Sequence, residues 1–164
     1  MAFPEDLLEQ AQHLARRESK RPKQASLRRA VSTAYYALFH LLISEATRNW
    51  KRASQRHSLG RAFDHGAMRS ACERKRSELN KYLNPRPAPS HQVTVSEHLL
   101  TVTNTFIQLQ QYRHMADYDN GKQWSRREVS FHLTALETAF RSWKVISDDD
   151  AAQDLLVTLL IKHR

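Results

Sequence analysis

The stretch from Arg28 to Ile43, RRAVSTAYYALFHLLI, constrains the fold of this chain more than any other feature. Its apolar residues recur at steps of three and four, which is the period of an α-helix. Aromatic and aliphatic side chains also cover much of the remaining circumference, and a helix that is apolar nearly all round is buried on several sides. The sequence therefore predicts a long central helix, over about residues 23–50, inside a helical bundle.

The composition favours a single all-α domain. The chain has 164 residues, with only three glycines and five prolines, which leaves little room for tight β-turns. Its length is close to that of one typical domain. We therefore expect an up-and-down bundle of four to five helices, with residues 1–164 forming one domain.

Local signals divide the rest of the chain into helices and connections. Gly66 weakens the middle of one expected helix by about 1 kcal/mol relative to alanine, and this helix can be broken there. Ser125 followed by Glu128 forms a capping box at the start of another helix. The expected helices cover residues 4–21, 23–50, 58–83, 94–117 and 125 onward. A basic connection is expected at 51–57 and an extended proline-rich loop at 84–90. A last helix should begin at about residue 147, and it either docks on the bundle or pairs with another chain.

The charge and the cysteine content limit the classes of function. Lysine and arginine number 26 against 17 acidic residues, and a formal net charge of +9 favours nucleic acid, an acidic protein or an anionic membrane surface as partner. Cys72 is the only cysteine, so neither an intrachain disulfide nor a multi-cysteine zinc site can form. Glycine-rich phosphate loops and metal-ligand spacings are absent, so we expect no metal and no cofactor. Without a signal peptide pattern or a long apolar run, we expect a cytoplasmic protein that does not span a membrane.

The segment YRHMADYDN, residues 112–120, holds a candidate anion site. Arg113 falls on the core-facing stripe of its helix, where a guanidinium is rarely buried without a partner. Asp117 lies one helical turn later and can pair with it. One interpretation is a structural ion pair that closes the bundle, with Tyr118 packed beside it. The other is an anion site, in which Asp117 orients Arg113 for bidentate contacts with a phosphate.

Two motifs of this chain, in this order, resemble those of the HEPN family (higher eukaryotes and prokaryotes nucleotide-binding). The first is SxAYYALFH, from Ser32 to His40, in which Tyr35, Tyr36 and His40 are either aromatic core residues or part of a binding motif. The second is RxxADYD, from Arg113 to Asp119. Between them, His57-Ser58-Leu59-Gly60 and Phe63 are similar to the histidine-containing segment of that family. The resemblance covers roughly residues 5–140, and residues 69–91 look like an insertion or a lengthened helix hairpin.

The resemblance implies a helical bundle that forms a homodimer. Many members of the family are encoded beside a small nucleotidyltransferase, as halves of toxin–antitoxin pairs. Catalytically active members are metal-independent RNases with an arginine and a histidine four to six residues apart at the dimer interface. In this chain, Tyr118, Asp119 and Asn120 occupy the positions after Arg113 where that histidine would fall.

Three hypotheses follow from these residues. The first is a HEPN-like, toxin–antitoxin-type module that binds RNA or a nucleotidyltransferase partner. The second is a metal-independent endoribonuclease in which Arg113 stabilises the scissile phosphate and His57, or another nearby histidine, acts as the base. The third is a purely structural dimerisation bundle. A groove that holds both His57 and Arg113 would favour the enzyme.

Overall fold

The computed structural model describes residues 2–162, which form seven α-helices and no β-strand. The predicted all-α class is therefore confirmed, although the expected four to five helices are fewer than the structure contains. The helices are α1 (Phe3–Arg16), α2 (Gln24–Arg48), α3 (Ala53–Gly60), α4 (His65–Tyr82), α5 (His91–Tyr118), α6 (Arg126–Ile146) and α7 (Asp150–Leu160).

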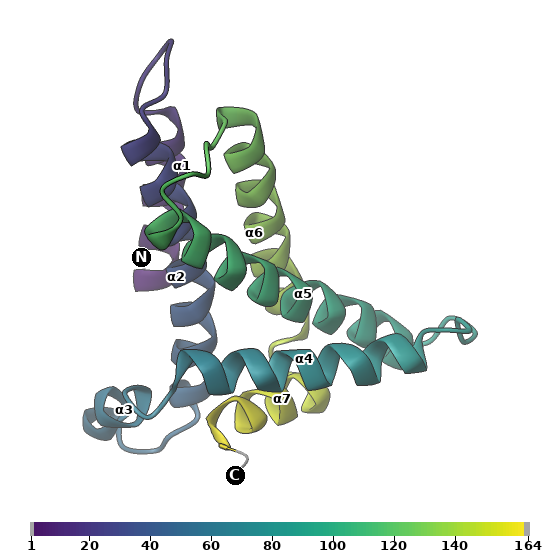
Figure 1. Cartoon of the computed structure of the whole chain (residues 1–164). Helices are drawn as coiled ribbons and strands as arrows, with labels where there is room; N and C mark the ends of the chain where they lie inside the picture. Colours follow the sequence, from purple (N-terminus) through teal and green to yellow (C-terminus); the bar gives the residue numbers. More distant parts are fainter. Residues whose placement is uncertain (1, 163–164) are drawn as a thin grey trace.

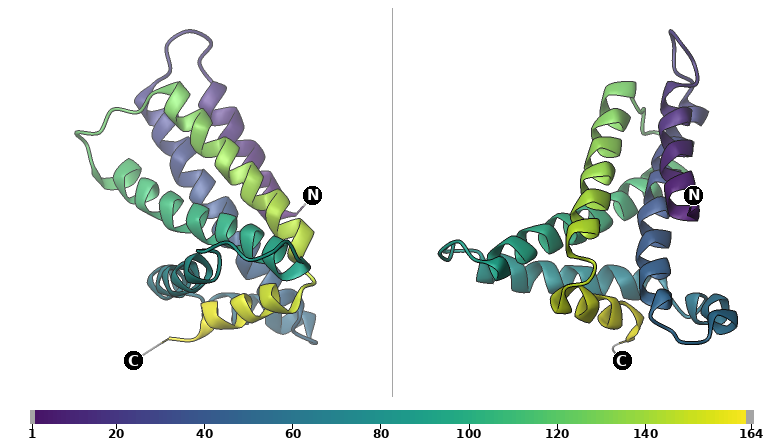
Figure 2. Two further views of the ribbon diagram at one scale, coloured as in Figure 1. Left: turned by 90° about the vertical axis from the view of Figure 1, so that its right-hand side faces the viewer. Right: turned by 180° about the vertical axis from the view of Figure 1, so that it is seen from behind.

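The helices pack in two groups that α5 joins. Helices α1, α2 and α6 lie side by side, and α5 crosses them at an angle (Figures 1 and 2). Helices α4 and α7 pack against each other and run across one end of this group. Helix α4 and the first half of α5 project together as a hairpin, with the loop at 83–90 at its tip (Figure 1). Residues 69–91, which we expected to be an insertion or a lengthened helix hairpin, thus lie in a helix hairpin of this fold.

Helix α2 is the central helix that the sequence predicts, and its ends lie within two residues of the expected ones. Tyr35, Leu38 and Leu42 on this helix are completely buried, as are several of its alanines. Helices α1, α5 and α6 cover α2 from different sides. Because α2 supplies the centre of the core, large-to-small substitutions along it leave cavities that the surroundings fill poorly.

Two expectations about residues 51–83 are wrong. The segment predicted as a connection over 51–57 contains the start of α3 at Ala53, and the following break lies at 61–64 instead of at Gly66. The side chain of Asp64 accepts a hydrogen bond of 2.8 Å from the backbone N–H of Ala67, so it caps α4, and Gly66 falls inside the first turn. At the end of α3, a Cβ on Gly60 would lie 3.3 Å from Cγ2 of Ile43, so glycine allows α3 to approach α2 closely.

The remaining helix boundaries follow from caps and from packing. Helix α5 begins slightly before the expected residue 94, because Ser90 accepts a hydrogen bond of 3.2 Å from the backbone N–H of Val93. Ser125 caps α6 as predicted. Helix α7 docks within the chain through buried leucines that include Leu155 and Leu159. Within residues 2–162, no helix combines the length and the apolar character needed to cross a membrane.

Candidate functional site

Arg113 lies against two tyrosine rings at the contact between α5 and α2. Its guanidinium carbon is 5.2 Å from the centre of the Tyr35 ring and 5.8 Å from that of Tyr36. The side chain is only 15% exposed. A cation at this distance from a ring face is attracted by the ring quadrupole, and the attraction strengthens where water is excluded. The arrangement therefore holds a positive charge at the edge of the core.

The N–H donors of this guanidinium have few acceptors among residues 2–162. Nη1 of Arg113 is 3.7 Å from Oδ2 of Asp117, which is an ion pair but is too long for a hydrogen bond. Asp117 also accepts a hydrogen bond of 3.4 Å from Ser32, and its side chain is 28% exposed. Nε of Arg113 is buried and has no hydrogen-bond partner among residues 2–162. A guanidinium has five N–H donors; the buried Nε cannot reach an acceptor outside the chain, so such an acceptor would meet the terminal nitrogens, of which Nη1 has only the long contact with Asp117.

Tyr35 connects this arginine to a histidine on a third helix. The phenol oxygen of Tyr35 is 2.6 Å from Nδ1 of His65, the first residue of α4. Burial raises the pKa of Tyr35, and the positive charge of Arg113 only partly opposes this, so the phenol is protonated at neutral pH. Its hydrogen needs an acceptor, and Nδ1 of His65 is the partner that the structure provides. We therefore assign the neutral His65 tautomer that carries its hydrogen on Nε2.

The surroundings of His65 hold its ring in place and keep it neutral. The ring stacks on Phe39 with centroids 4.2 Å apart, and Gln110 on α5 donates a hydrogen bond of 3.1 Å to the His65 carbonyl. Burial lowers the pKa of His65, the charge of Arg113 lowers it further, and Asp64 acts in the opposite direction. His65 is therefore a neutral, oriented imidazole beside the arginine.

Sequence reasoning missed His65 because it placed the start of the helix wrongly. The expected helix over 58–83 put this residue mid-helix, and only Gly66 was considered as a break. The signal that would have located it is Asp64, a favoured N-cap residue directly before the histidine. His57, the histidine that the sequence suggested, is exposed on α3. Within the described part of the chain, no hydrogen bond, ion pair or ring contact joins His57 to Arg113.

Of the other predicted site residues, Tyr36 and His40 lie in the aromatic cluster, and Tyr118 lies outside it. Tyr36 and His40 extend the aromatic cluster along α2, with ring centroids 6.3 Å apart, and Phe3 of α1 packs on His40 at 5.0 Å. Burial lowers the pKa of His40, and repulsion between the protonated forms of His40 and the nearby His65 lowers it further. Tyr118 does not pack beside the ion pair as expected. It is 67% exposed, and its ring contacts His114 at a centroid distance of 5.0 Å.

Arg28 fixes the end of α5 that carries the site. Its two terminal nitrogens donate hydrogen bonds of 2.9 Å to the carbonyl of Ala116 and 2.5 Å to that of Lys122. The carbonyls at the end of a helix lack intrahelical partners, and a charged donor satisfies them well. Arg28 thereby holds the backbone next to Asp117 and positions the carboxylate that faces Arg113.

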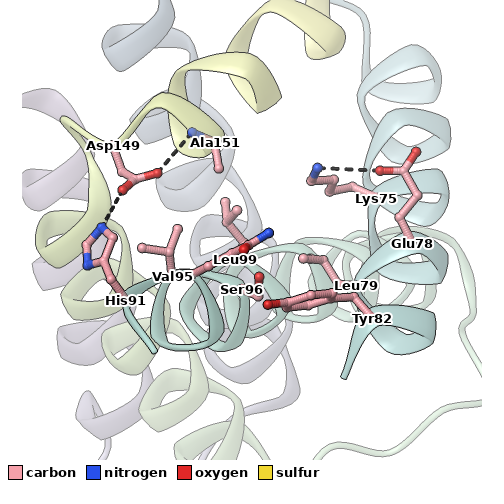
Figure 3. A pocket seen from close by; sticks show the side chains of 11 residues that line it. Lys75, Glu78, Leu79, Tyr82, His91, Val95, Ser96, Leu99, Asp149 and Ala151 are labelled. Atoms are coloured by element: carbon pink, nitrogen blue, oxygen red, sulfur yellow. Dashed lines mark hydrogen bonds and ion pairs between the residues drawn. The ribbon is translucent and has the colours of Figure 1, made fainter. Parts of the chain in front are cut away.

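A separate pocket of about 270 Å³ lies between α4, α5 and α7 (Figure 3). Val95 and Leu99 form part of its apolar floor. Two ion pairs flank it: Lys75 with Glu78 at 3.4 Å, and His91 with Asp149 at 2.8 Å. Its charged groups already pair with each other, and the pocket lies on the opposite end of α5 from the arginine. Among residues 2–162, no three histidine, cysteine, aspartate or glutamate side chains gather closely enough to hold a metal ion.

The structure thus brings Tyr35, Tyr36, His40, Arg113 and Asp117 together with His65, and we call this set the Arg113 cluster. No protein-family model matches the chain, and comparisons with curated proteins and with solved structures return no match. The likeness to the HEPN family accordingly stays an expectation from the motif residues, of which Tyr35, Tyr36, His40, Arg113 and Asp117 belong to this cluster.

Proposed function

We propose that this chain is a HEPN-like helical module of the toxin–antitoxin type that binds RNA through the Arg113 cluster. The observation that carries the proposal is the guanidinium of Arg113, which is held over two tyrosine rings, is partly exposed, and has only a long ion-pair contact of 3.7 Å with Asp117. Arginine matches the geometry of a phosphate group, and charge-assisted hydrogen bonds to phosphate are among the strongest that proteins form. The net charge of +9 supports a polyanionic partner.

The neighbours of Arg113 favour binding of a phosphate and disfavour a simple internal ion pair. Asp117 contacts the guanidinium at 3.7 Å, so it orients the side chain without saturating its donors. His65 adds a neutral N–H donor in the assigned tautomer. Tyr36 is partly exposed and offers a ring on which an unpaired base can stack, as bases of single-stranded RNA commonly do.

RNA binding by Arg113 is tested by fluorescence anisotropy with a labelled single-stranded RNA at low salt. A hydrogen bond to a charged group contributes about 1.5–3 kcal/mol, so Arg113→Ala should weaken binding roughly ten- to 150-fold. Arg127→Ala is the matched control, since Arg127 is exposed on α6 and the change in net charge is the same. An equal loss in both variants would mean that the overall positive charge, and not the Arg113 cluster, binds the RNA.

The double substitution Arg113→Ala with Asp117→Ala separates binding from stability. Arg113→Ala alone leaves the Asp117 carboxylate without its cation, which lowers stability to the extent that the pair is buried. Removing both charges should restore stability while RNA binding stays lost. Recovery of both properties would assign Arg113 a structural role and would favour the third hypothesis, a dimerisation bundle.

A metal-independent endoribonuclease is the second candidate, and the position of His65 beside Arg113 favours it. A general base needs a free lone pair within about 3.2 Å of the proton that it removes. In the assigned tautomer, the lone pair of Nδ1 is already occupied by the phenol of Tyr35, so His65 acts as a donor and RNA binding is the better-supported function. Cleavage of RNA in EDTA by the wild type, but not by His65→Gln or Arg113→Ala, would make the endoribonuclease the better-supported function.

The proposal includes a homodimer in the cytoplasm and a nucleotidyltransferase partner. Phe131 and Val145 on α6 are 72% and 67% exposed, and large apolar side chains at the surface are candidates for burial in a subunit interface. If two copies meet along α5 and α6, their Arg113 side chains flank one shared positive groove, as a two-fold interface requires. Sedimentation should show a dimer that Phe131→Glu dissociates, and a monomeric wild type would contradict the dimer. Co-purification with a nucleotidyltransferase encoded beside the gene would support that partner.

A further inference from the structure

A second cavity, of about 440 Å³, opens between α2 and α3 next to the Arg113 cluster. Its volume lies within the range of about 300–1,000 Å³ that is usual for small-ligand sites. Phe39, Ile43 and Phe63 supply the apolar part of its lining, and His40 belongs both to this lining and to the cluster. Gly60 allows α3 to lie close to Ile43, so the cavity is a narrow space between two helices.

The lining combines aromatic and apolar surface with positive charge. Arg56, His57 and Arg61 lie at this cavity, and none of the described residues that line it is acidic. Arg113 is not in the lining, so the cavity does not hold His57 and Arg113 together. The Nε of Arg56 donates a hydrogen bond of 3.0 Å to the carbonyl of Trp50, which holds its guanidinium against the wall. Arg61 is exposed and is free to cover a ligand. A planar ring that carries a negative charge fits such a lining, and a nucleotide has both features.

The cavity adjoins the Arg113 cluster through His40 and Phe39, while Arg113 itself does not line it. His40 packs on Tyr36, and Phe39 stacks on His65 at 4.2 Å; Tyr36 and His65 both belong to the surroundings of Arg113. The step from Tyr36 to His40 is about one helical turn, or roughly 6 Å along the axis of α2. Tyr36 also lies 5.8 Å from the Arg113 guanidinium, so a phosphate at Arg113 and a base at the cavity one or two nucleotides along the strand, at about 3.4 Å for each stacked step, are within reach of one RNA strand.

We propose that the cavity between α2 and α3 is a base-binding subsite, which takes the base of a nucleotide adjacent to the phosphate held at Arg113. This inference rests on the proposed RNA binding and specifies single-stranded RNA as the ligand. The base enters the apolar space bounded by Phe39, Ile43 and Phe63, while the guanidinium of Arg61 covers its outer face. Stacking of bases on aromatic rings and on arginine planes is the usual way in which proteins hold unpaired RNA.

The test compares two RNA hexamers that differ only in their bases. The first is hexa-adenylate, and in the second the four inner residues lack bases, so both have the same phosphates. Stacking on a protein surface is worth enough that the base-bearing hexamer should bind the wild type about fivefold or more tightly than the abasic one. The measured quantity is this ratio of the two dissociation constants.

Matched variants connect the ratio to the cavity. Arg61→Ala should lower the ratio towards one, whereas Arg52→Ala should leave it unchanged, because Arg52 is an equally exposed cation that precedes the same helix without lining the cavity. Arg113→Ala should weaken binding of both hexamers and preserve the ratio. Circular dichroism of each variant verifies that the helices are intact.

The outcomes separate this inference from the function on which it rests. Equal binding of the two hexamers by the wild type, or a ratio that Arg61→Ala does not change, would overturn the base subsite and leave RNA binding at Arg113 intact. Failure of both hexamers to bind at low salt would overturn the RNA-binding function itself. Binding of an acidic peptide such as polyglutamate, without binding of either hexamer, would identify a protein partner instead.

Discussion

Replacing Tyr35 with phenylalanine removes the hydrogen bond that joins α2 to α4. The ring remains in its contacts with Phe106, at 5.5 Å, and with Arg113, at 5.2 Å, so the change removes the 2.6 Å bond to His65 and the polar contact of the phenol oxygen with Arg113. A buried polar group left without any hydrogen-bond partner lowers stability by about 1–3 kcal/mol. A neutral hydrogen bond whose lost partner is replaced by water contributes only about 0.5–1.5 kcal/mol. His65 is half-buried, so we take a value within the lower range and expect Tyr35→Phe to lower the free energy of unfolding by about 1 kcal/mol.

Two measurements test this expectation. Urea denaturation gives the change in stability, with Tyr36→Phe as the control, because the structure provides no hydrogen bond for the Tyr36 phenol among residues 2–162. Titration of the His65 ring by NMR reports the tautomer. A phenol that donates to Nδ1 stabilises the neutral imidazole, so removing it should raise the pKa of His65 towards its ordinary value. Burial and the charge of Arg113 still hold that pKa below the ordinary value.

Two results would refute the reasoning. A pKa of His65 that falls in Tyr35→Phe would mean that Nδ1 carries the hydrogen and that Nε2 has the free lone pair. The endoribonuclease alternative would then be the stronger one, because His65 could act as a base. A destabilisation well above 3 kcal/mol would mean that the phenol has partners besides His65 and Arg113.

Three further predictions concern the core, the charge and the pH dependence. Leu38→Ala should cost about 2–5 kcal/mol in urea denaturation, since Leu38 is completely buried in α2, and a loss under about 0.5 kcal/mol would contradict its central place. RNA affinity should fall steeply between 50 and 200 mM salt, because each phosphate contact releases about one counterion. Binding that is insensitive to salt would contradict phosphate recognition. Burial lowers the pKa of His132, so below about pH 6.5 the unfolded chain binds more protons than the folded one, and stability should drop as the pH falls from 7.5 to 5.5. His132→Phe keeps the ring stacked on Tyr112 and should reduce this drop, whereas an unchanged drop would assign it to other groups.

The sequence predicted those parts of the site that lie within one helix. The pairing of Arg113 with Asp117 follows from helix geometry, because residues four apart face each other whatever surrounds them. The burial of Tyr35 follows in the same way from the apolar circumference of α2. That these residues meet depends on how α5 packs on α2, and helical periodicity carries no information about which two faces come together.

The residues that sequence reasoning misplaced lie where the apolar pattern is weak. Helix α3 has no buried residue, so residues 53–60 show no apolar stripe from which a helix could be predicted. The position of His65 depends on where α4 begins. The side chain of Asp64 caps the helix and sets this boundary, whereas the low helix propensity of Gly66 does not set it. Tyr118 points into solvent because α5 ends there and no neighbouring element covers that face.

The positions of Tyr35 and His65 along the chain determine when, during synthesis and folding, the hydrogen bond between them can form. Helices α1 and α2 are consecutive and contact each other, so their pairing requires only a short loop to close. The cluster needs α2, α4 and α5 together, and its arginine is in the second half of the chain. Pulse-labelled hydrogen exchange should therefore protect the amides of α2 before those at the start of α4. A nascent chain on the ribosome carries the basic surplus and the two tyrosines before it carries Arg113, so binding that depends on the Arg113 cluster arises later in translation than any general attraction to polyanions.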